Sequence, residues 1–384
     1  MNRALVLTGT FPDAKRRYAI HGLCEALLRR GWTLDFVTLG QSLISQFNPR
    51  NLWPHVAQRP VNQWIKLEPN LWSFVWKAPF HPLNLRHDLL NKIITPIHRL
   101  YPKLLPAEVR LRAETADLIL FDSSYSTIFI GMMRALAPNA VLVYNASDRL
   151  RTHRAHPLVC QCEMKYSPLL DLVRVPAQVM IGDYPNGARA VYIPHGLDKA
   201  SFSARSQNPF STSKNAISIG DGLFDKWALD VLAMSYPDWK FHLFGVGSLP
   251  SVPRKNIIVH GEERFANLIP YIKYADVGLA PYRLSDSADY LSQSSMRMIQ
   301  YTYCRLPILV PFFAASGRAH ACGYEPGDAS SLRKAFAKAI HYDRGTIDDV
   351  EVLSWDEVLE QVLEKAFAAW EERSTHKVQD CAPI

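Results

Sequence analysis

The residues with the clearest chemical pattern lie between positions 272 and 311. This stretch combines a predicted buried strand at Val277–Pro281, a polar loop, a helix opening near Ser294 and a second apolar strand at Leu306–Val310. Two short apolar strands separated by one helix are typical of a βαβ unit in a parallel sheet. Such sheets bind ligands beyond the carboxyl ends of their strands, so we expect a ligand at the loop before this helix.

That loop-to-helix junction, residues 292–297, reads SQSSMR. Ser294 and Ser295 supply two hydroxyls, the start of the helix supplies unpaired backbone N–H groups, and Arg297 adds a positive charge. Helix N-termini attract phosphate through their dipole and these donors. The pattern predicts a phosphate-binding site, although the serines also fit ordinary N-capping, with Arg297 as a surface charge.

A carboxylate follows another predicted strand in the same way. The segments 117–121 (DLILF) and 140–144 (AVLVY) are predicted as buried strands, and the second runs directly into NASDRL. Asp148 therefore lies just past the carboxyl end of a strand, where α/β enzymes place reacting groups. Such a carboxylate can act as a general base, whereas by position alone capping of a following helix is its commoner role.

The chain begins with a Rossmann-like pattern. A strand at Ala4–Leu7 leads through a glycine-containing loop to a helix from Tyr18 to Arg30 and a strand at Thr33–Thr38. The string G-x-G-x-x-G is absent, which argues against a dinucleotide cofactor. Three residues near the start of the helix are candidates to face a cleft, unless they are only solvated charges: Arg16, Arg17 and His21.

The later sequence predicts a two-domain α/β protein. Strands at 179–181 and 190–193 are expected to close the first domain, and His195 then either contacts a ligand or fills a turn. The predicted organisation is an N-terminal domain at 1–200, a polar linker at 201–215, a second domain at 216–353 and a C-terminal helix at 354–384 that opens with a capping box. Two doubly wound units joined in this way form a ligand-binding cleft.

The first 110 residues are basic and rich in tryptophan. They contain 15 Lys and Arg against six Asp and Glu, whereas the whole chain of 384 residues has a net charge of +7. Five of the nine tryptophans lie here: Trp32, Trp53, Trp64, Trp72 and Trp76. This composition occurs on surfaces that bind anionic membranes or nucleic acid, and on ordinary basic surfaces. Residues 40–84 are otherwise predicted to be irregular.

An amphipathic helix is predicted between residues 86 and 104, with a kink at Pro96. Its apolar residues recur at helical spacing, and its basic residues, Arg86, Lys92, Arg99 and Lys103, lie elsewhere around the axis. A helix in a membrane interface and a helix packed on its own sheet both give this pattern, and packing is the commoner cause.

The remaining composition narrows the class of protein. A hydrophobic fraction of 48% and a charged fraction of 21% are those of a globular protein. Six scattered cysteines without a C-x-x-C pair disfavour a zinc site or a disulfide framework, and fit a reducing compartment. We expect neither a secretory signal nor a membrane span, because no apolar run approaches about 18 residues.

Taken together, these motifs resemble the GT-B glycosyltransferases, and more narrowly the GumK-type glucuronosyltransferases of xanthan assembly. The resemblance extends over nearly the whole chain. Its most specific strings are VY-x-ASD-x-L at 143–150 and YL-x-x-SSM-x-x-x-QY at 290–301. The other matching strings are RR-x-x-IH (16–21), HG-x-D (195–198), LFD (223–225), V-x-GE (259–262), YIK-x-A (271–275) and APY (280–282).

The resemblance implies two Rossmann-like domains that face a cleft, with the last helix returning to the N-domain. It implies an inverting, metal-independent transfer of glucuronate from UDP-glucuronate to a lipid-pyrophosphate-linked oligosaccharide in exopolysaccharide assembly. It also implies a monotopic enzyme, without a cofactor, on the cytoplasmic face of the inner membrane, whose partners are the donor, the lipid-linked acceptor and the anionic membrane surface.

The resemblance also assigns site residues. Asp148 matches the family's catalytic base. The residues matching the donor site are Glu262, Tyr282, Ser294, Ser295, Met296, Arg297 and Gln300. Gly222 stands where the family has Met, and Arg297 stands where it has Lys, which replaces a point charge with a planar fork. Candidates for the acceptor side or the cleft are Arg16, Arg17, His21, His195 and Asp198.

The residue chemistry fits this reaction. Inverting transfer needs one base for the acceptor hydroxyl and a cation or fixed dipoles for the leaving diphosphate. The chain has no D-x-D motif for a metal, but residues 294–297 offer the second kind of stabiliser. Our hypothesis for the cation that recognises the donor carboxylate is Arg16, Arg17 or Lys273. The alternatives are a transferase for another UDP-sugar such as UDP-glucose, and a nucleic-acid-binding protein, which lacks any recognised motif here.

Overall fold

The computed structural model describes residues 2–43, 59–152, 155–247, 254–285 and 288–379, with side chains as far as residue 375. The chain divides into two compact units. The first comprises Met1–Ala14, Ala19–Ile193 and Asp356–Ile384, and the second comprises Lys15–Tyr18 and Pro194–Trp355. Each unit contains its own β-sheet.

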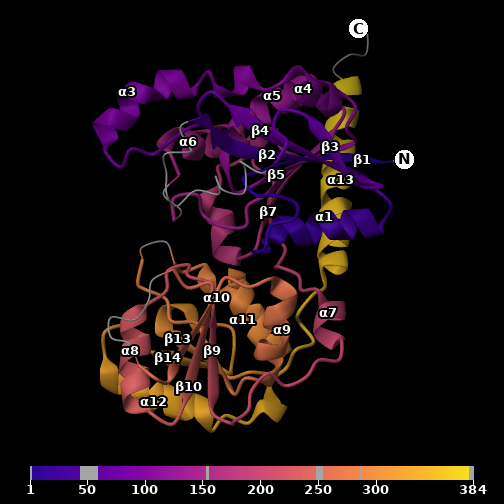
Figure 1. The fold of residues 1–384 in the computed structure, drawn as a ribbon. Coiled ribbons are helices and arrows are strands. Elements are labelled where there is room, and N and C mark those ends of the chain that lie inside the picture. Colours follow the sequence, from indigo (N-terminus) through magenta and orange to yellow (C-terminus); the bar gives the residue numbers. More distant parts are fainter. Residues whose placement is uncertain (1, 44–58, 153–154, 248–253, 286–287, 380–384) are drawn as a thin grey trace. The chain divides into compact units, whose positions relative to one another are not determined.

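The first unit is built on an eight-stranded sheet of order β3-β4-β2-β1-β5-β6-β7-β8 with helices packed around it (Figure 1). Every neighbouring pair is parallel except β3 and β4. The inner strands β1, β5 and β6 are largely apolar runs, as expected for strands covered on both faces. The strands are β1 (Arg3–Thr8), β2 (Thr33–Ser42), β3 (Trp64–Glu68), β4 (Leu71–Ala78), β5 (Leu118–Asp122), β6 (Val141–Asn145), β7 (Leu172–Val175) and β8 (Ala190–Tyr192), and the helices are α1 (Ala19–Arg29), α3 (Asp88–His98), α4 (Ala107–Glu114), α5 (Ile130–Leu136), α6 (Pro157–Tyr166) and α13 (Trp355–Gln379).

The second unit is a six-stranded, wholly parallel sheet of order β11-β10-β9-β12-β13-β14, also flanked by helices (Figure 1). Its core joins residues of the strands to aromatic and aliphatic side chains of α8 and α12. The strands are β9 (Asn215–Ile219), β10 (Lys240–Phe244), β11 (Ile257–Gly261), β12 (Val277–Leu279), β13 (Ile308–Pro311) and β14 (Ala321–Tyr324), and the helices are α7 (Lys199–Ser203), α8 (Lys226–Ser235), α9 (Phe265–Tyr274), α10 (Leu291–Ser294), α11 (Met296–Tyr303) and α12 (Ala329–Ile340).

Each sheet has one point at which the strand order reverses. In the first unit the chain leaves β1 toward β2 and later returns to β5 on the other side of β1. In the second unit it leaves β9 toward β10 and β11, and returns to β12 on the other side of β9. In doubly wound sheets, ligands bind beyond the carboxyl ends of the strands at such switch points. The loops after β1, β5, β9 and β12 are therefore the candidate ligand-binding loops.

The C-terminal helix α13 belongs to the first unit and is anchored there by a buried carboxylate. Asp171, which is 2% exposed, accepts hydrogen bonds from Arg134 Nη2 (2.7 Å), Arg373 Nε (2.8 Å) and the backbone N–H of Leu142 (2.8 Å). Trp370 of the same helix donates its indole N–H to the carbonyl of Asn139 (2.8 Å). Residues 380–384 lie outside the described part of the chain.

The predicted linker at 201–215 lies inside the second unit, because the boundary between the units falls after Ile193. The ammonium group of Lys273 donates to the carbonyl of Ala204 (2.7 Å), and the hydroxyl of Tyr274 donates to the carbonyl of Ser206 (2.6 Å). These contacts attach the polar stretch to α9. Its Ser- and Asn-rich composition therefore marks a surface segment of the second unit.

Two regions of the first unit differ from the sequence prediction. The region 40–84, expected to be irregular, contains β3 and β4; the aromatic and aliphatic side chains of β4 pack on the core, which favours a strand. The segment predicted as a strand at 179–181 is part of a 3₁₀ helix (Gln178–Asp183). The strand is instead β7, whose apolar run is interrupted by the buried Arg174. Residues 44–58 are not described.

The amphipathic helix α3 presents its apolar face outward. Leu89, Ile93 and Ile97 are 60%, 65% and 51% exposed, whereas the side chains buried beneath the helix are Asn91 and His98. Asn91 is held by hydrogen bonds with Asn84 and the backbone of Leu85, and His98 packs against the ring of His156. Of the two alternatives that the sequence left open, packing of the apolar face on the sheet is therefore excluded, because polar contacts fix the opposite face inward.

Candidate functional site

The loops that follow β9 and β12, at the switch point of the second unit, are joined by their backbones. The N–H of Asp225 donates to the carbonyl of Pro281 (2.7 Å), the N–H of Arg283 donates to the carbonyl of Leu223 (2.6 Å), and Phe224 and Tyr282 form a β-bridge. Leu223 has a positive φ of 52°. The loop 220–225 (GDGLFD) is thus fixed against the segment that carries Tyr282.

The predicted helix at Ser294 is divided into two. The short helix α10 ends at Ser294, Ser295 is extended (φ −66°, ψ 108°), and α11 begins at Met296. Ser295 is the N-cap of α11: its Oγ accepts a hydrogen bond from the N–H of Met298 (3.4 Å) and is also hydrogen-bonded to the hydroxyl of Tyr282. For Ser295, the capping role that the sequence offered as an alternative is therefore the role it plays.

Ser294 and Arg297 differ from Ser295 because each has a buried donor atom that makes no hydrogen bond to a described residue. Ser294 is 5% exposed, and neither its Oγ nor Nη1 of Arg297 has a hydrogen-bond partner among the described residues. Arg297 is held by its other nitrogen, Nη2, which donates to the carbonyl of Gly220 (3.3 Å), and its guanidinium lies 5.0 Å from the centre of the Tyr282 ring. A buried donor left unpaired is costly, so this pair indicates a place for an anionic ligand.

The other donor-site residues predicted in this unit surround the same switch point. Gln300 is buried on α11, one turn after the residues just described, and Met296 packs against the neighbouring apolar cluster. Gly222 lies in the loop after β9, and a side chain added there would meet no atom within 4 Å. A Cβ atom can therefore be added at this position, where the resembling family has Met, without meeting a neighbouring atom.

Glu262 follows β11 and lies beside an arginine of the segment Lys15–Tyr18, which belongs to the second unit. Nε of Arg16 is 3.7 Å from Oε1 of Glu262, and its Nη1 is 3.3 Å from Oδ1 of Asp221. Nη2 of the same arginine donates to the carbonyl of Gly245 (3.3 Å). Arg16, which was predicted to face a cleft or to recognise the donor carboxylate, thus joins the ends of β9, β10 and β11.

The remaining second-unit candidates have local partners. Asp198 caps α7, because its carboxylate accepts hydrogen bonds from the N–H and the hydroxyl of Ser201. His195 is buried, with its ring 6.0 Å from that of Trp355. These contacts account for both side chains of the HG-x-D turn within the fold of this unit.

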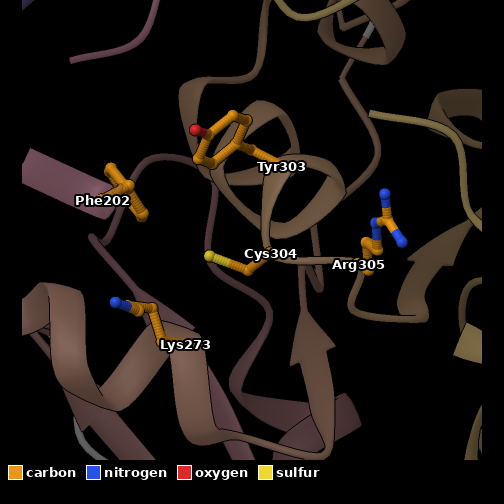
Figure 2. Close-up of a pocket in the computed structure, with 5 residues that line it drawn as sticks. All are labelled: Phe202, Lys273, Tyr303, Cys304 and Arg305. Atoms are coloured by element: carbon orange, nitrogen blue, oxygen red, sulfur yellow. The ribbon is translucent and has the colours of Figure 1, made fainter. Parts of the chain in front are cut away.

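Lys273 lies away from the switch-point loops. It occupies the last turn of α9, immediately before β12, and therefore sits at the amino end of that strand. There it lines a small pocket of about 190 Å³ together with Phe202, Tyr303, Cys304 and Arg305 (Figure 2). Lys273 thus lies at the opposite end of β12 from the predicted donor-site residues, which follow the carboxyl ends of the strands.

In the first unit, Asp148 lies three residues beyond the end of β6 and does not cap the next helix. The N-cap of α6 is His156, whose Nδ1 accepts the N–H of Leu158 (3.1 Å). The backbone N–H of Asp148 donates to Oγ of Ser123 (3.3 Å), which follows β5 at the switch point. The alternative role of Asp148 as a helix cap is therefore removed, and its position beyond the strand remains that of a reacting group. The nearby residues 153–154 are outside the described part.

His21 and Arg17, the other candidates near the N-terminus, are placed differently. His21 is 2% exposed within α1, where its Nε2 is hydrogen-bonded with the carbonyl of Phe11 (2.8 Å) and its ring stacks on Phe36. It therefore holds the loop after β1 to the helix. Arg17 is half-buried in the segment that groups with the second unit.

One polar residue of this region was missed by the sequence analysis. Asp122 ends β5 at the switch point and accepts hydrogen bonds from the hydroxyl of Thr8 (3.0 Å) and the amide of Asn145 (3.3 Å). Burial, together with the negative charge of Asp148, raises the pKa of this carboxyl to about 6. The available signal was the acid that closes the apolar run LILFD, at the carboxyl end of its strand as Asn145 is at the end of β6.

Comparison with known proteins places these features in one class. Residues 6–176 match the family described as "Glucuronosyltransferase GumK, N-terminal domain". Over 364 residues the chain is 28% identical to the UDP-glucuronate:glycolipid 2-beta-glucuronosyltransferase of Xanthomonas campestris pv. campestris, covering 94% of this chain and 89% of the relative.

Solved structures support the fold. Sucrose-phosphate synthase from Thermosynechococcus elongatus superposes with a TM-score of 0.67 at 15% identity, over 96% of this chain and 100% of that one. A trehalose-6-phosphate structure from E. coli bound with UDP-2-fluoro glucose superposes with a TM-score of 0.56 at 13% identity, over 100% of both chains. At these identities the likeness concerns the fold.

The chain is a glycosyltransferase with the GT-B fold, as predicted. Its resemblance to the GumK-type enzymes, which the sequence motifs indicated, is likewise confirmed by the matching N-terminal domain and by the relative that covers nearly the whole chain.

Proposed function

We propose that this enzyme transfers glucuronate from UDP-glucuronate to a lipid-pyrophosphate-linked saccharide with inversion at the anomeric carbon. The observation that carries the donor assignment is the pair of unpartnered buried donors, Ser294 Oγ and Arg297 Nη1, at the switch point of the second sheet. The sugar and the glycolipid acceptor come from the name of the Xanthomonas relative.

In the proposed reaction Asp148 removes the proton from the acceptor hydroxyl as that oxygen attacks the anomeric carbon of the donor. The bond from the anomeric carbon to the diphosphate oxygen breaks, and UDP leaves with the bonding electrons. The leaving group gains negative charge, which Arg297, Ser294 and the N-terminus of α11 are suited to stabilise. Because these groups supply the positive charge and the hydrogen bonds, the proposal includes no metal and no cofactor.

The nucleoside end of the donor is assigned to the other switch-point residues. Glu262 is proposed to accept hydrogen bonds from the ribose hydroxyls, and Gly222 lies where the open loop leaves room for the base. The guanidinium of Arg297 lies over the ring of Tyr282, and the hydroxyl of Tyr282 is hydrogen-bonded to Ser295. Of the cations considered for the sugar carboxylate, Arg16 is the one whose contacts to Asp221 and Glu262 place it at this switch point.

Donor identity is tested by thermal unfolding with UDP, UDP-glucuronate, UDP-glucose and GDP-mannose on protein purified in detergent. A ligand that binds only the folded state raises the unfolding temperature in proportion to its binding free energy. We expect stabilisation by UDP and a larger effect of UDP-glucuronate. Equal stabilisation by UDP-glucose would favour a transferase for another UDP-sugar, and no response to any nucleotide would contradict the donor site.

We also propose that the enzyme docks peripherally on the cytoplasmic face of the inner membrane through α3. No described helix combines the length and apolarity needed to cross a bilayer. The exposed apolar side chains of α3 continue into the turn that follows it, where Leu100 and Leu104 are also exposed. Exposed lysine and arginine side chains border this strip: Arg86, Lys92, Arg99 and Lys103.

This combination suits an anionic lipid surface in particular. The apolar side chains can insert at the boundary between headgroups and acyl chains, and the flanking cations then lie level with the phosphates. Each basic residue near an anionic surface contributes about 1 kcal/mol to binding. A lipid-linked acceptor would be presented in the same plane, so docking and acceptor supply would depend on one surface.

The charge-reducing variant Lys92→Ala/Arg99→Ala/Lys103→Ala is expected to weaken binding to anionic vesicles by at least about tenfold, since three cations are lost. Co-sedimentation with phosphatidylglycerol vesicles at low salt measures this. The matched control is Arg333→Ala/Lys334→Ala/Lys338→Ala, which removes the same charge from exposed positions of α12. Equal binding by both variants would remove α3 as the docking element.

A further inference from the structure

A row of polar side chains crosses the carboxyl ends of the strands in the first unit. Asp122 of β5 and Asn145 of β6 are direct partners in the parallel ladder, and Asn145 is the partner of Arg174 on β7. The side chains continue this register: Nη1 of Arg174 donates to Oδ1 of Asn145 (2.9 Å), and Nδ2 of Asn145 donates to Oδ1 of Asp122 (3.3 Å). Thr8 of β1 completes the row with its hydroxyl on Asp122 (3.0 Å).

Such a buried polar row needs a physical reason. Arg174 and Asn145 are both 0% exposed, and burying charged and amide groups is unfavourable unless they are hydrogen-bonded. The row also coincides with the switch point, between β1 and β5, where doubly wound sheets place reacting groups. Its position therefore relates it to the chemistry of Asp148.

Two chains of hydrogen bonds lead from Asp122 to the segment that carries Asp148. In the first, Nδ2 of Asn145 donates both to Asp122 and to Oγ of Ser147 (2.7 Å), the residue before Asp148. In the second, Ser123, the residue after Asp122, accepts the backbone N–H of Asp148 on its Oγ (3.3 Å) and donates to the carbonyl of Asn145 (3.3 Å). The turn 145–148 is thus held from both sides.

We propose that Asp122 is a positioning residue for Asp148: it fixes the 145–148 turn and places a second negative charge beside the base. The proposal rests on Asp148 being the base of the proposed reaction. A carboxylate next to another carboxylate is a stronger base, because the neighbouring charge favours proton uptake. The charged groups that face Asp122 are Asp148, from the segment after β6, and Arg174, from β7.

This arrangement predicts how the rate depends on pH. The pKa of Asp122 is raised to about 6, first by burial and further by the charge of Asp148. Below about pH 6 Asp122 takes up a proton, the second negative charge beside the base is lost, and the rate falls. Above that pH Asp122 is ionised and the charge is present.

The test is the pH profile of turnover for Asp122→Asn, measured with UDP-glucuronate and a glycolipid acceptor extract. The amide keeps the shape and accepts a hydrogen bond but carries no charge. We expect turnover at pH 8 to fall about tenfold, because the second negative charge beside the base is removed. We also expect the acid limb to move to lower pH, because the carboxyl that takes up a proton near pH 6 is no longer there. The control Asp117→Asn, which changes an exposed acid just before the same strand, should keep the wild-type profile.

Two results would overturn the proposal. A lower rate with an unmoved acid limb would mean that Asp122 only stabilises the fold, and an unchanged rate and limb would mean that it has no role in the reaction. Thermal unfolding with UDP shows whether each variant still folds and binds the donor. Asp148→Asn is measured in the same series. If it retains full turnover, the base assignment fails. The two failures are distinguishable, because this one is seen in Asp148→Asn and does not depend on the pH profile of Asp122→Asn.

Discussion

Replacement of Asp148 by Asn is expected to lower turnover by about 10²–10⁴-fold while leaving UDP binding intact. The amide has the shape of the carboxylate but cannot take up a proton, so only the base function is removed. Helix α6 is capped by His156 and not by Asp148, so the substitution leaves that cap intact.

Turnover of Asp148→Asn is measured as release of UDP in the presence of acceptor, and donor binding as the shift of the unfolding temperature by UDP. Asp117→Asn serves as the control for a charge change in the same unit. Wild-type turnover in Asp148→Asn would show that this carboxyl only shapes the turn after β6. Loss of both turnover and UDP stabilisation would instead indicate a folding defect.

The sequence predicted the fold well because α/β periodicity is a local signal. The apolar runs 4–7 and 140–144 correspond to strands β1 and β6, with bounds that differ by one residue. The strand β7 was missed because its apolar pattern contains Arg174, and the reason for that arginine is a neighbour on β6 that is distant in sequence. Such a residue is explained only by the sheet register.

The candidate site was also predicted in part from the sequence, and the rest required tertiary contacts. The motif around Ser294 located the switch-point helix, and the resemblance to a family supplied the roles of the residues. The sequence could not distinguish Ser294 from Ser295, since both are hydroxyls at one helix start. The structure separates them: Ser295 caps α11 and contacts Tyr282, whereas Oγ of Ser294 has no partner among the described residues. The partner of Tyr282 lies 13 positions along the chain, beyond the reach of a local pattern.

The amphipathic helix illustrates why composition alone misleads. Its apolar spacing correctly indicated a helix, but the face that packs inward depends on Asn91 and His98 finding polar and aromatic partners in distant segments. Hydrophobic periodicity gives the direction of the apolar face relative to the helix axis and not relative to the sheet. Only the tertiary contacts decide whether that face is covered.

Replacement of Arg297 by Ala is expected to lower kcat/KM by about 10²–10³-fold, because the cation that stabilises the leaving diphosphate is removed. It should also reduce the stabilisation by UDP. Arg297 is already oriented without ligand, by the carbonyl of Gly220 and the ring of Tyr282, and this leaves Nη1 as the donor that an anion would satisfy. Because Arg297 is held in this way, its positive charge is already in position for the diphosphate before the reaction begins.

Two further variants separate charge from geometry at this position. Arg297→Lys keeps the charge but loses the planar fork, and a lysine cannot hold the carbonyl of Gly220 and the phosphate with the same rigidity; we expect an intermediate loss. Arg333→Ala removes an exposed charge of α12 and should behave as wild type. If Arg297→Ala retains wild-type kcat/KM and UDP stabilisation, the diphosphate is bound elsewhere, and the unpartnered donors need another ligand. A graded series, in which Arg exceeds Lys and Lys exceeds Ala, would instead show that both the charge and the fork of Arg297 act on the leaving group.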